Sequence, residues 1–272
     1  MDNKATLGKK KVLAITGIML AIITVLIIML YIMIHAIQVK SEGQARLQTQ
    51  PSDYTYELMK ASNGMELHVL KVKPSNITLT AINNNVALTP NYGINGGFFY
   101  EQSLLSIAIV DSIPVNGAIG DYGSGNENAK YARGTLVWDG ARDELSVQVV
   151  SKASELKVKD HTRFWAQGGI SMSINDEANW AEQAALEQAP FPDEDRLRSG
   201  AVYDRHGMLY LVVSSTKGSL DLFRDAILEQ VGGGQLEDGI FLDGDGSSQL
   251  QSADAVLTGD NRPVVQMMQI IK

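Results

Sequence analysis

Alternating and β-branched apolar positions predict a strand-rich domain. Residues 66–72 place Leu67 and Val69 against Leu70 and Val72, and residues 77–82 are β-branched and apolar, so both segments predict strands. Residues 135–138 and 145–150 predict a strand pair joined through a loop at 139–140, longer than a two-residue hairpin turn. The run at 209–213 has the composition of a buried strand.

Helical spacing is clearest at residues 220–231, with Ser219 as the expected N-cap and Gly232 as the expected stop. A second helix is predicted at 178–188, mostly alanine and polar residues. We therefore predict an α/β (mixed α+β) fold: a single domain with a mixed β-sheet core flanked by helices. It should contain a strand-helix-strand unit near its end.

The N-terminal segment contains a long apolar run. Residues 12–34 are 23 in number and carry no charge, which is long enough for a helix to cross a bilayer. A cleaved signal peptide has a shorter apolar region and a small-residue cleavage site. We therefore predict a transmembrane signal anchor at 12–37, with the lysines of the preceding tail 1–11 in the cytoplasm.

The predicted plan continues with a stalk at 38–53 and a folded domain at 54–272, outside the cell. Residues 1–40 carry five lysines and one aspartate, so a chain charge of −8 leaves −12 on residues 41–272. An acidic domain argues against nucleic acid as a partner. With no cysteine, the chain has no disulfide and no thiolate nucleophile. This composition suits a bacterial cell surface.

The most informative candidate chemistry follows the apolar run 240–242. Asp243, Gly244, Asp245, Gly246, Ser247 and Ser248 form one short loop with carboxylates, hydroxyls and conformationally free glycines. Neighbouring carboxylates raise one another's pKa, as a general acid in hydrolysis requires. Alternatively, one aspartate is a ligand and the other caps the loop.

The same loop resembles the first half of a calcium site. The twelve-residue calcium loop needs glycine at position six and glutamate at position twelve, where this chain has Ser248 and Asp254. An EF-hand site is therefore disfavoured, although a different divalent cation site at Asp243 and Asp245 stays open. The sequence requires no cofactor.

Three further segments offer polar and aromatic ligand contacts. They are Asn95-Gly96-Gly97-Phe98-Phe99, Gln167-Gly168-Gly169 and Arg198-Ser199-Gly200. The glycines of the first two serve either a ligand loop or an ordinary turn. Arg198 either clamps a phosphate or carboxylate, or pairs with Asp193 or Glu194 on the surface.

In this order along residues 60–271, these segments resemble the phosphodiester glycosidase family. The resemblance implies a single pocket that cleaves a sugar from a phosphate diester, with Asn95, Arg198, Asp243, Ser247 and Ser248 at matching positions. It implies phosphate binding by Arg198 and the loop amides, sugar contact by Phe98 or Phe99, and proton chemistry or a sugar hydroxyl contact for Asp243. It also implies a glycan or glycosyl-phosphate substrate in cell-surface polymers.

Two positions depart from the family pattern. Asp245 replaces a glycine and adds negative charge beside the expected phosphate site, and Ser199 replaces a threonine. Asp245 favours an alternative, a glycan-binding or exopolysaccharide-assembly protein without turnover. A calcium-dependent adhesion module is the third reading. Replacing Asp245 with glycine distinguishes two cases. A gain of hydrolysis would indicate a disabled enzyme, whereas loss of existing activity would show that Asp245 takes part in the reaction.

Overall fold

A computed structural model of the protein describes residues 24–31, 33 and 50–272. The chain divides into two compact units, Met1–Thr49 and Gln50–Lys272. The described residues 24–31 and 33 are helical. The predicted tail 1–11, most of the span 12–37 and most of the stalk 38–53 lie outside the described residues. Within the described part of the chain, no helix combines the length and apolar character needed to cross a membrane.

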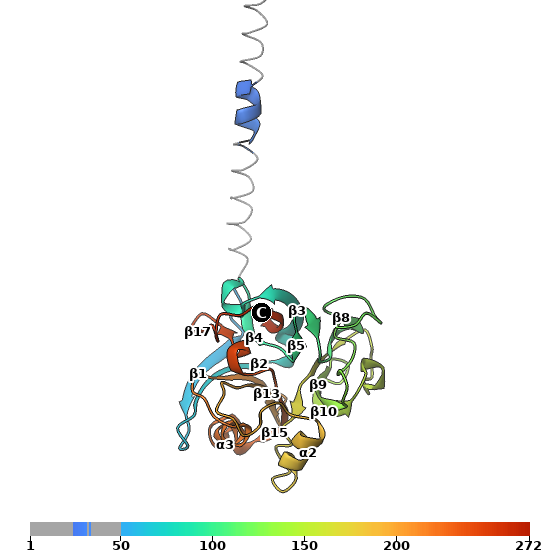
Figure 1. The fold of residues 1–272 in the computed structure, drawn as a ribbon, viewed down its shortest axis with the longest axis vertical. Coiled ribbons are helices and arrows are strands. Elements are labelled where there is room, and N and C mark those ends of the chain that lie inside the picture. The colour runs from blue at the N-terminus through green and yellow to red at the C-terminus, as the bar shows by residue number, and fades with distance from the viewer. Residues whose placement is uncertain (1–23, 32, 34–49) are drawn as a thin grey trace, which may run out of the picture. The chain divides into compact units, whose positions relative to one another are not determined.

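Residues 50–272 are built mainly from three antiparallel sheets (Figure 1). The first has the order β1 (Tyr54–Lys60), β2 (Glu66–Val72), β14 (Leu209–Ser214), β13 (Ser199–Asp204), β15 (Leu236–Phe241), β12 (Ile170–Ser171). The second has the order β10 (Glu144–Val150), β9 (Arg133–Asp139), β11 (Phe164–Gly168), β7 (Ala108–Val110), β8 (Ile113–Pro114). The third has the order β17 (Val256–Leu257), β16 (Leu250–Gln251), β4 (Tyr92–Asn95), β18 (Val264–Ile270), β3 (Ile77–Asn84). A small hairpin pairs β5 (Phe99–Tyr100) with β6 (Ser103–Leu104).

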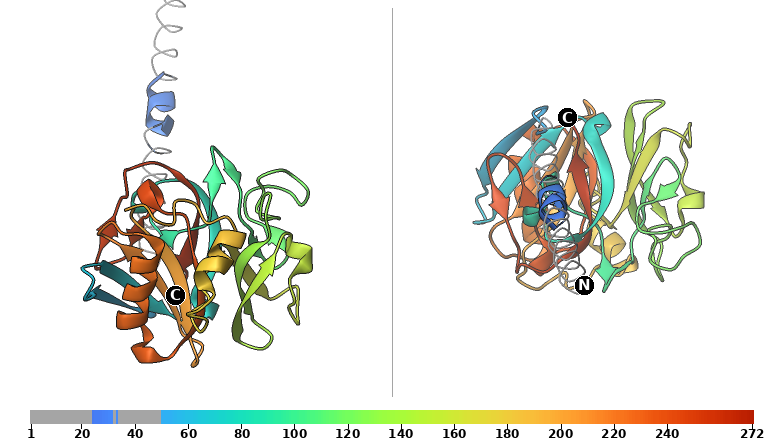
Figure 2. Two further views of the ribbon diagram at one scale, coloured as in Figure 1. Left: turned by 60° about the horizontal axis from the view of Figure 1, so that its bottom comes forward. Right: turned by 90° about the horizontal axis from the view of Figure 1, so that it is seen from above.

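The α+β class is confirmed, but the single mixed sheet is corrected. Every strand pair in the described residues is antiparallel, and the strands divide among separate sheets. Sequence periodicity shows which face of a strand is apolar, whereas the direction of its neighbour depends on pairings between distant segments. In both views of Figure 2, the strands from β7 to β11 lie together on one side of the domain.

The two helices of the domain occur where the sequence predicts them. They are α2 (Trp180–Leu186) and α3 (Leu220–Gln230). α3 connects β14 to β15, which lie on either side of β13, so the predicted strand-helix-strand unit is present. Gly232 follows α3 with a positive φ of 68°, a conformation that glycine adopts without strain. The Ser219 hydroxyl bonds to Asp221 rather than to a backbone amide.

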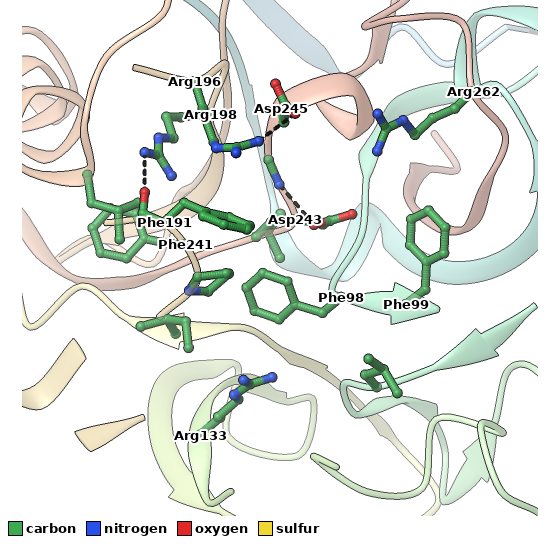
Figure 3. Close-up of a pocket in the computed structure, with 16 residues that line it drawn as sticks. Phe98, Phe99, Arg133, Phe191, Arg196, Arg198, Phe241, Asp243, Asp245 and Arg262 are labelled. Atoms are coloured by element: carbon green, nitrogen blue, oxygen red, sulfur yellow. Dashed lines mark hydrogen bonds and ion pairs between the residues drawn. The ribbon is translucent and has the colours of Figure 1, made fainter. Parts of the chain in front are cut away.

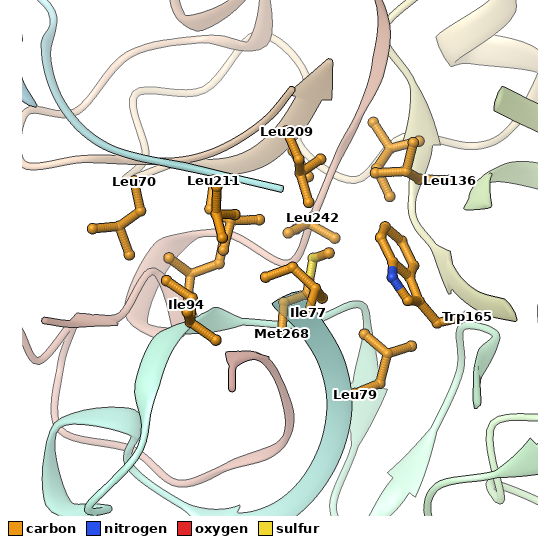
Figure 4. Packing of buried hydrophobic residues seen from close by; sticks show 14 of the residues in the cluster. Leu70, Ile77, Leu79, Ile94, Leu136, Trp165, Leu209, Leu211, Leu242 and Met268 are labelled. Atoms are coloured by element: carbon orange, nitrogen blue, oxygen red, sulfur yellow. The ribbon is translucent and has the colours of Figure 1, made fainter. Parts of the chain in front are cut away.

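The central strands of the six-stranded sheet are buried on both faces. Leu67 and Val69 face a cluster that contains Phe223 and Ile227 of α3. Leu70, on the opposite face, belongs to a cluster with Ile94 and Met268 of the third sheet and Trp165 of the second, shown in Figure 4. Burying a side chain of this size stabilises the fold by about 1.5–3 kcal/mol. The sheet therefore forms a rigid base for the segments that leave its ends.

The loop 243–248, which the sequence predicts to carry the chemistry, crosses from the first sheet to the third. It leaves β15 after Phe241 and reaches β16 at Leu250, which pairs with Ile94 in β4. Leu242 N donates to Ser199 O at 2.9 Å, and Asp243 N donates to Gly96 O at 3.3 Å. These bonds join three predicted site segments at one place.

Candidate active site

A cavity of about 300 Å³ lies at this junction (Figure 3). Its lining combines four arginines, two aspartates, one glycine and an apolar wall that includes four phenylalanines: Arg133, Arg196, Arg198, Arg262, Asp243, Asp245, Gly244, Phe98, Phe99, Phe191, Phe241, Leu105, Leu220, Leu242, Ile170 and Pro190. Cationic side chains thus outnumber anionic ones by two in a domain that is acidic as a whole. This charge balance favours an anionic ligand with an apolar face.

Asp243 has the chemistry of a proton donor near neutral pH. Burial raises the pKa of its half-buried carboxyl to about 6, against the lowering effects of the Ser247 hydroxyl, the Gly244 amide and the Arg262 charge. The Gly244 N–H donates to Asp243 Oδ1 at 3.1 Å. Asp245 raises the pKa only as a smaller contribution, so burial is the main cause rather than the neighbouring carboxylate that the sequence suggested.

The raised pKa predicts that Asp243 lowers stability above pH 6. Between about pH 4 and 6 the folded protein holds a proton that the unfolded chain releases, so the free energy of unfolding falls as pH rises. The cost is complete above about pH 7 and amounts to as much as about 3 kcal/mol. Asp243→Asn should therefore melt higher than the wild type at pH 8, with no difference at pH 4. Equal melting temperatures at pH 8 would contradict the raised pKa.

Asp245 is engaged in an ion pair at the edge of the cavity. Arg196 Nη1 donates to Asp245 Oδ2 at 2.7 Å, while Arg196 Nη2 donates to Glu194 at 2.7 Å. The Arg196 guanidinium also stacks on the Phe191 ring, 4.0 Å from its centroid. The negative charge that Asp245 adds to the loop is therefore offset by Arg196, which the sequence did not single out.

Arg198 is buried and holds the segment that borders the cavity. Its Nε donates to Gly218 O at 2.9 Å, and its Nη2 donates to Phe191 O at 2.8 Å and Glu194 O at 2.6 Å. It does not pair with a carboxylate among the described residues; the surface ion pair to Glu194 belongs to Arg196. Burial lowers the pKa of Arg198 to about 10, so its guanidinium stays charged. Nη1 donates to no atom of the described residues.

Arg262 enters the cavity on a loop braced by two buried amides. Asn85 Nδ2 donates to Thr258 O at 2.9 Å, and Gln249 Nε2 donates to Arg262 O at 2.9 Å. The Arg262 side chain pairs with Asp260, and this hydrogen bond raises the pKa of Arg262. Its positive charge also lowers the pKa of Asp243. Arg262 and Asp243 therefore lie in the same part of the cavity, close enough for their charges to interact.

Several predicted site residues lie beneath the cavity rather than in its wall. Asn95 Oδ1 accepts from Ser199 Oγ at 2.9 Å and from Gln249 N at 3.1 Å, and Asn95 Nδ2 donates to Asp243 O at 2.8 Å. The Asn95 amide is thus fully used in positioning the loop. Ser247 contacts the Asp243 carboxyl, and the buried Ser248 hydroxyl has no hydrogen-bond partner among the described residues.

The predicted glycines permit close backbone packing around this junction. A Cβ on Gly96 would overlap the Gln266 amide, and one on Gly246 would overlap the Asp260 carboxylate. A Cβ on Gly97 would lie 2.6 Å from Gly168 O. Gly96 and Gly97 therefore exclude a larger side chain for reasons of packing, whereas a side chain at Gly246 would require the exposed Asp260 side chain to move.

Gln167, Gly168 and Gly169 lie in and after β11 and do not line the cavity. Gln167 is fully buried, and its Nε2 donates to Gly168 O at 2.9 Å. Gly169 N donates to Gly134 O at 2.8 Å, next to the cavity residue Arg133. Within the described residues, no three His, Asp or Glu side chains are grouped to hold a metal ion.

No family model and no curated protein matches this chain. Among solved structures, it is similar to the catalytic domain of zebrafish N-acetylglucosamine-1-phosphodiester alpha-N-acetylglucosaminidase, auto-inhibited by its pro-peptide. The TM-score is 0.52 at 15% identity, and the match covers 80% of this chain and 82% of that one. The two share a fold. A hypothetical protein from Synechocystis matches with a TM-score of 0.45 at 13% identity, over 79% of this chain and 61% of that chain.

Proposed function

We propose that this protein is a hydrolase that cleaves a glycosyl phosphodiester, or a related sugar linkage, in cell-surface polymers. The observation that carries the proposal is the cavity itself: a protonatable Asp243 stands among arginines and beside aromatic rings in an otherwise acidic domain. The resemblance in sequence motifs and the fold shared with a phosphodiester glycosidase domain support the same reaction class.

In the proposed reaction, two arginines and Phe98 bind the substrate and Asp243 transfers the proton. The phosphate oxygens accept hydrogen bonds from Arg262 and from the unused Nη1 of Arg198, while the apolar face of the sugar packs on Phe98. A water molecule adds its hydroxyl to the anomeric carbon, and the bond from this carbon to the phosphate oxygen breaks. Asp243 donates its proton to the departing oxygen and regains one from the water.

Location and cation dependence belong to the same proposal. The uncharged run 12–34 supports a single-pass anchor that leaves the C-terminal domain outside the cell. The proposed reaction needs no resident cofactor. Binding of a divalent cation by the Asp243 and Asp245 loop is tested by measuring sugar release with added cations and with a chelator. Recovery of the full chain from the membrane fraction of expressing cells, lost on deletion of 12–37, checks the anchor.

The experiment that tests the function is release of free sugar from a panel of glycosyl phosphodiesters by the full chain in detergent. It is run with magnesium, with calcium and with a chelator. Release of sugar and a phosphate monoester supports the proposal. Binding of the panel without any release would instead favour the glycan-binding protein, since the pocket would then lack turnover.

Asp245→Gly should strengthen binding of the phosphodiester by about three- to ten-fold. The change frees Nη1 of Arg196, which keeps its ion pair with Glu194, and removes a negative charge from the cavity. Glycine also adopts the positive φ of 55° at this position without strain. Titration calorimetry against one panel substrate measures the effect. Weaker binding would show that the Asp245 carboxylate itself contacts the ligand.

A further inference from the structure

Arg133 forms a second cationic region in the same cavity. It is the first residue of β9, in a different sheet from the strands that carry Arg198 and Asp243 to the cavity. Figure 3 shows Arg133 across the Phe98 ring from Arg196, Arg198 and Arg262. Its guanidinium carbon lies 5.1 Å from the centroid of Phe98. The apolar ring therefore separates two positive ends of one cavity.

The charge of Arg133 has no carboxylate partner in residues 50–272. Nε donates to Glu187 O at 3.0 Å and Nη2 to Gln188 O at 3.3 Å, and both acceptors are uncharged carbonyls. The nearby Glu187 carboxylate is occupied elsewhere, because its Oε2 accepts from Gly134 N and Ser171 N, each at 2.8 Å. Nη1 of Arg133 donates to no atom of the described residues.

A half-buried guanidinium without a counter-ion is unfavourable unless a ligand supplies one. Burial lowers the pKa of Arg133, and this effect exceeds the opposing effect of the nearby Glu187 charge. Two carbonyls require only neutral N–H donors, so the bracing role does not explain an arginine at this position. An anion that entered the cavity from the Phe98 side would meet both the unused Nη1 and a charge that Glu187 compensates only in part.

We infer that the sugar ring of the substrate carries an acidic substituent, a carboxylate or a phosphate, which Arg133 binds. The inference rests on the proposed function, which places the phosphodiester at the Arg198 and Arg262 end and the ring on Phe98. The far edge of the ring then faces Arg133. A cavity of about 300 Å³ is at the small end of ligand sites, so one ring with two anionic groups suits it better than a long chain segment.

The test compares three ligands that differ only in the far substituent of one sugar. They are the methyl diester of glucose 1-phosphate, its 6-phosphate derivative and the corresponding glucuronic acid compound. Affinities are measured by titration calorimetry with the full chain carrying Asp243→Asn, in which turnover is expected to be about a thousand-fold slower. The two acidic ligands should bind at least about ten-fold more tightly than the neutral one, and the advantage should shrink as salt increases.

Variants at Arg133 separate charge recognition from bracing. Arg133→Gln keeps an N–H donor for the Glu187 and Gln188 carbonyls but removes the charge, so the advantage of the acidic ligands should fall to within about two-fold. Arg133→Lys should keep part of it, since it retains a charge without the planar fork. A variant that weakened all three ligands equally would show a bracing role only and would overturn the inference.

Turnover distinguishes failure of this inference from failure of the proposed function. Selective binding of the acidic ligands without sugar release would contradict the hydrolase and leave the Arg133 subsite in place. If the three ligands bind equally, or if none of them binds, the inference of an Arg133 subsite is overturned. This holds even if the wild type hydrolyses all three.

Discussion

Asp243→Asn is expected to lower kcat by about a thousand-fold while leaving the Kd for the substrate within a few-fold of wild type. A positioned general acid contributes roughly 10²–10⁴-fold to a rate, and the amide has the shape of the acid but no proton of suitable pKa to donate. The Gly244 N–H that contacts Asp243 Oδ1 can still donate to the amide oxygen, so the loop should keep its conformation. Initial rates of sugar release measure the loss.

The pH dependence gives an independent check on the same residue. Because the carboxyl acts in its protonated form and its pKa lies at about 6, the wild-type kcat should fall as pH rises through about 6. The residual activity of Asp243→Asn should not show this fall. A wild-type rate that rose across the same range would assign Asp243 a role as base or nucleophile instead.

Asp225→Asn is the matched control. Asp225 lies on the exposed side of α3, outside the cavity, and partial burial of its carboxyl together with the nearby Glu177 and Asp221 charges also raises its pKa. Its replacement removes one carboxylate charge from the same domain without touching the cavity. An equal loss of activity in both variants would show that Asp243 acts through general stability or charge.

Arg198→Lys is expected to lower the free energy of unfolding by about 3 kcal/mol, the largest stability effect among the cavity arginines. One planar guanidinium holds the carbonyls of Gly218, Phe191 and Glu194 together. Lysine keeps the charge but cannot reach three acceptors in this geometry, and a hydrogen bond to a charged group contributes roughly 1.5–3 kcal/mol. For a domain of this size, the melting temperature should fall by about 6–12 °C.

The control for this variant is Arg142→Lys. Arg142 is exposed and pairs with the buried Asp139 carboxylate on the second sheet, away from the cavity. Lysine keeps the charge, and Asp139 keeps its hydrogen bonds from the Ala141 and Lys159 amides, so the expected loss is only about 0–1 kcal/mol. Thermal melts of the two variants should therefore differ clearly. If Arg198→Lys melted with the wild type, the segment from Phe191 to Glu194 would owe its position to contacts other than the Arg198 fork.

The sequence predicted the local elements well because their signals are local. Residues 66–72 coincide with β2, residues 209–213 fall within β14, and residues 220–231 contain α3. Apolar spacing follows directly from the geometry of one strand or helix. The strands β1 and β18 were not predicted, although each has apolar positions that the pattern could have revealed.

The sequence also identified the loop that supplies Asp243, since few turns combine carboxylates, hydroxyls and glycines. It placed Phe98, Phe99, Arg198, Gly244 and Asp245 among the site candidates, and all of them line the cavity. It did not distinguish these wall residues from Asn95 and Ser199, which brace the loop from below. Residue type alone does not show which way a side chain faces.

Only the tertiary structure showed the arginines that give the cavity its charge. Arg133, Arg196 and Arg262 come from segments far apart in the chain, and each is unremarkable among its sequence neighbours. They meet because β9, the segment before β13 and the loop before β18 are brought together by pairings between distant strands. Such pairings depend on how whole sheets pack, so no local pattern of residues encodes them directly.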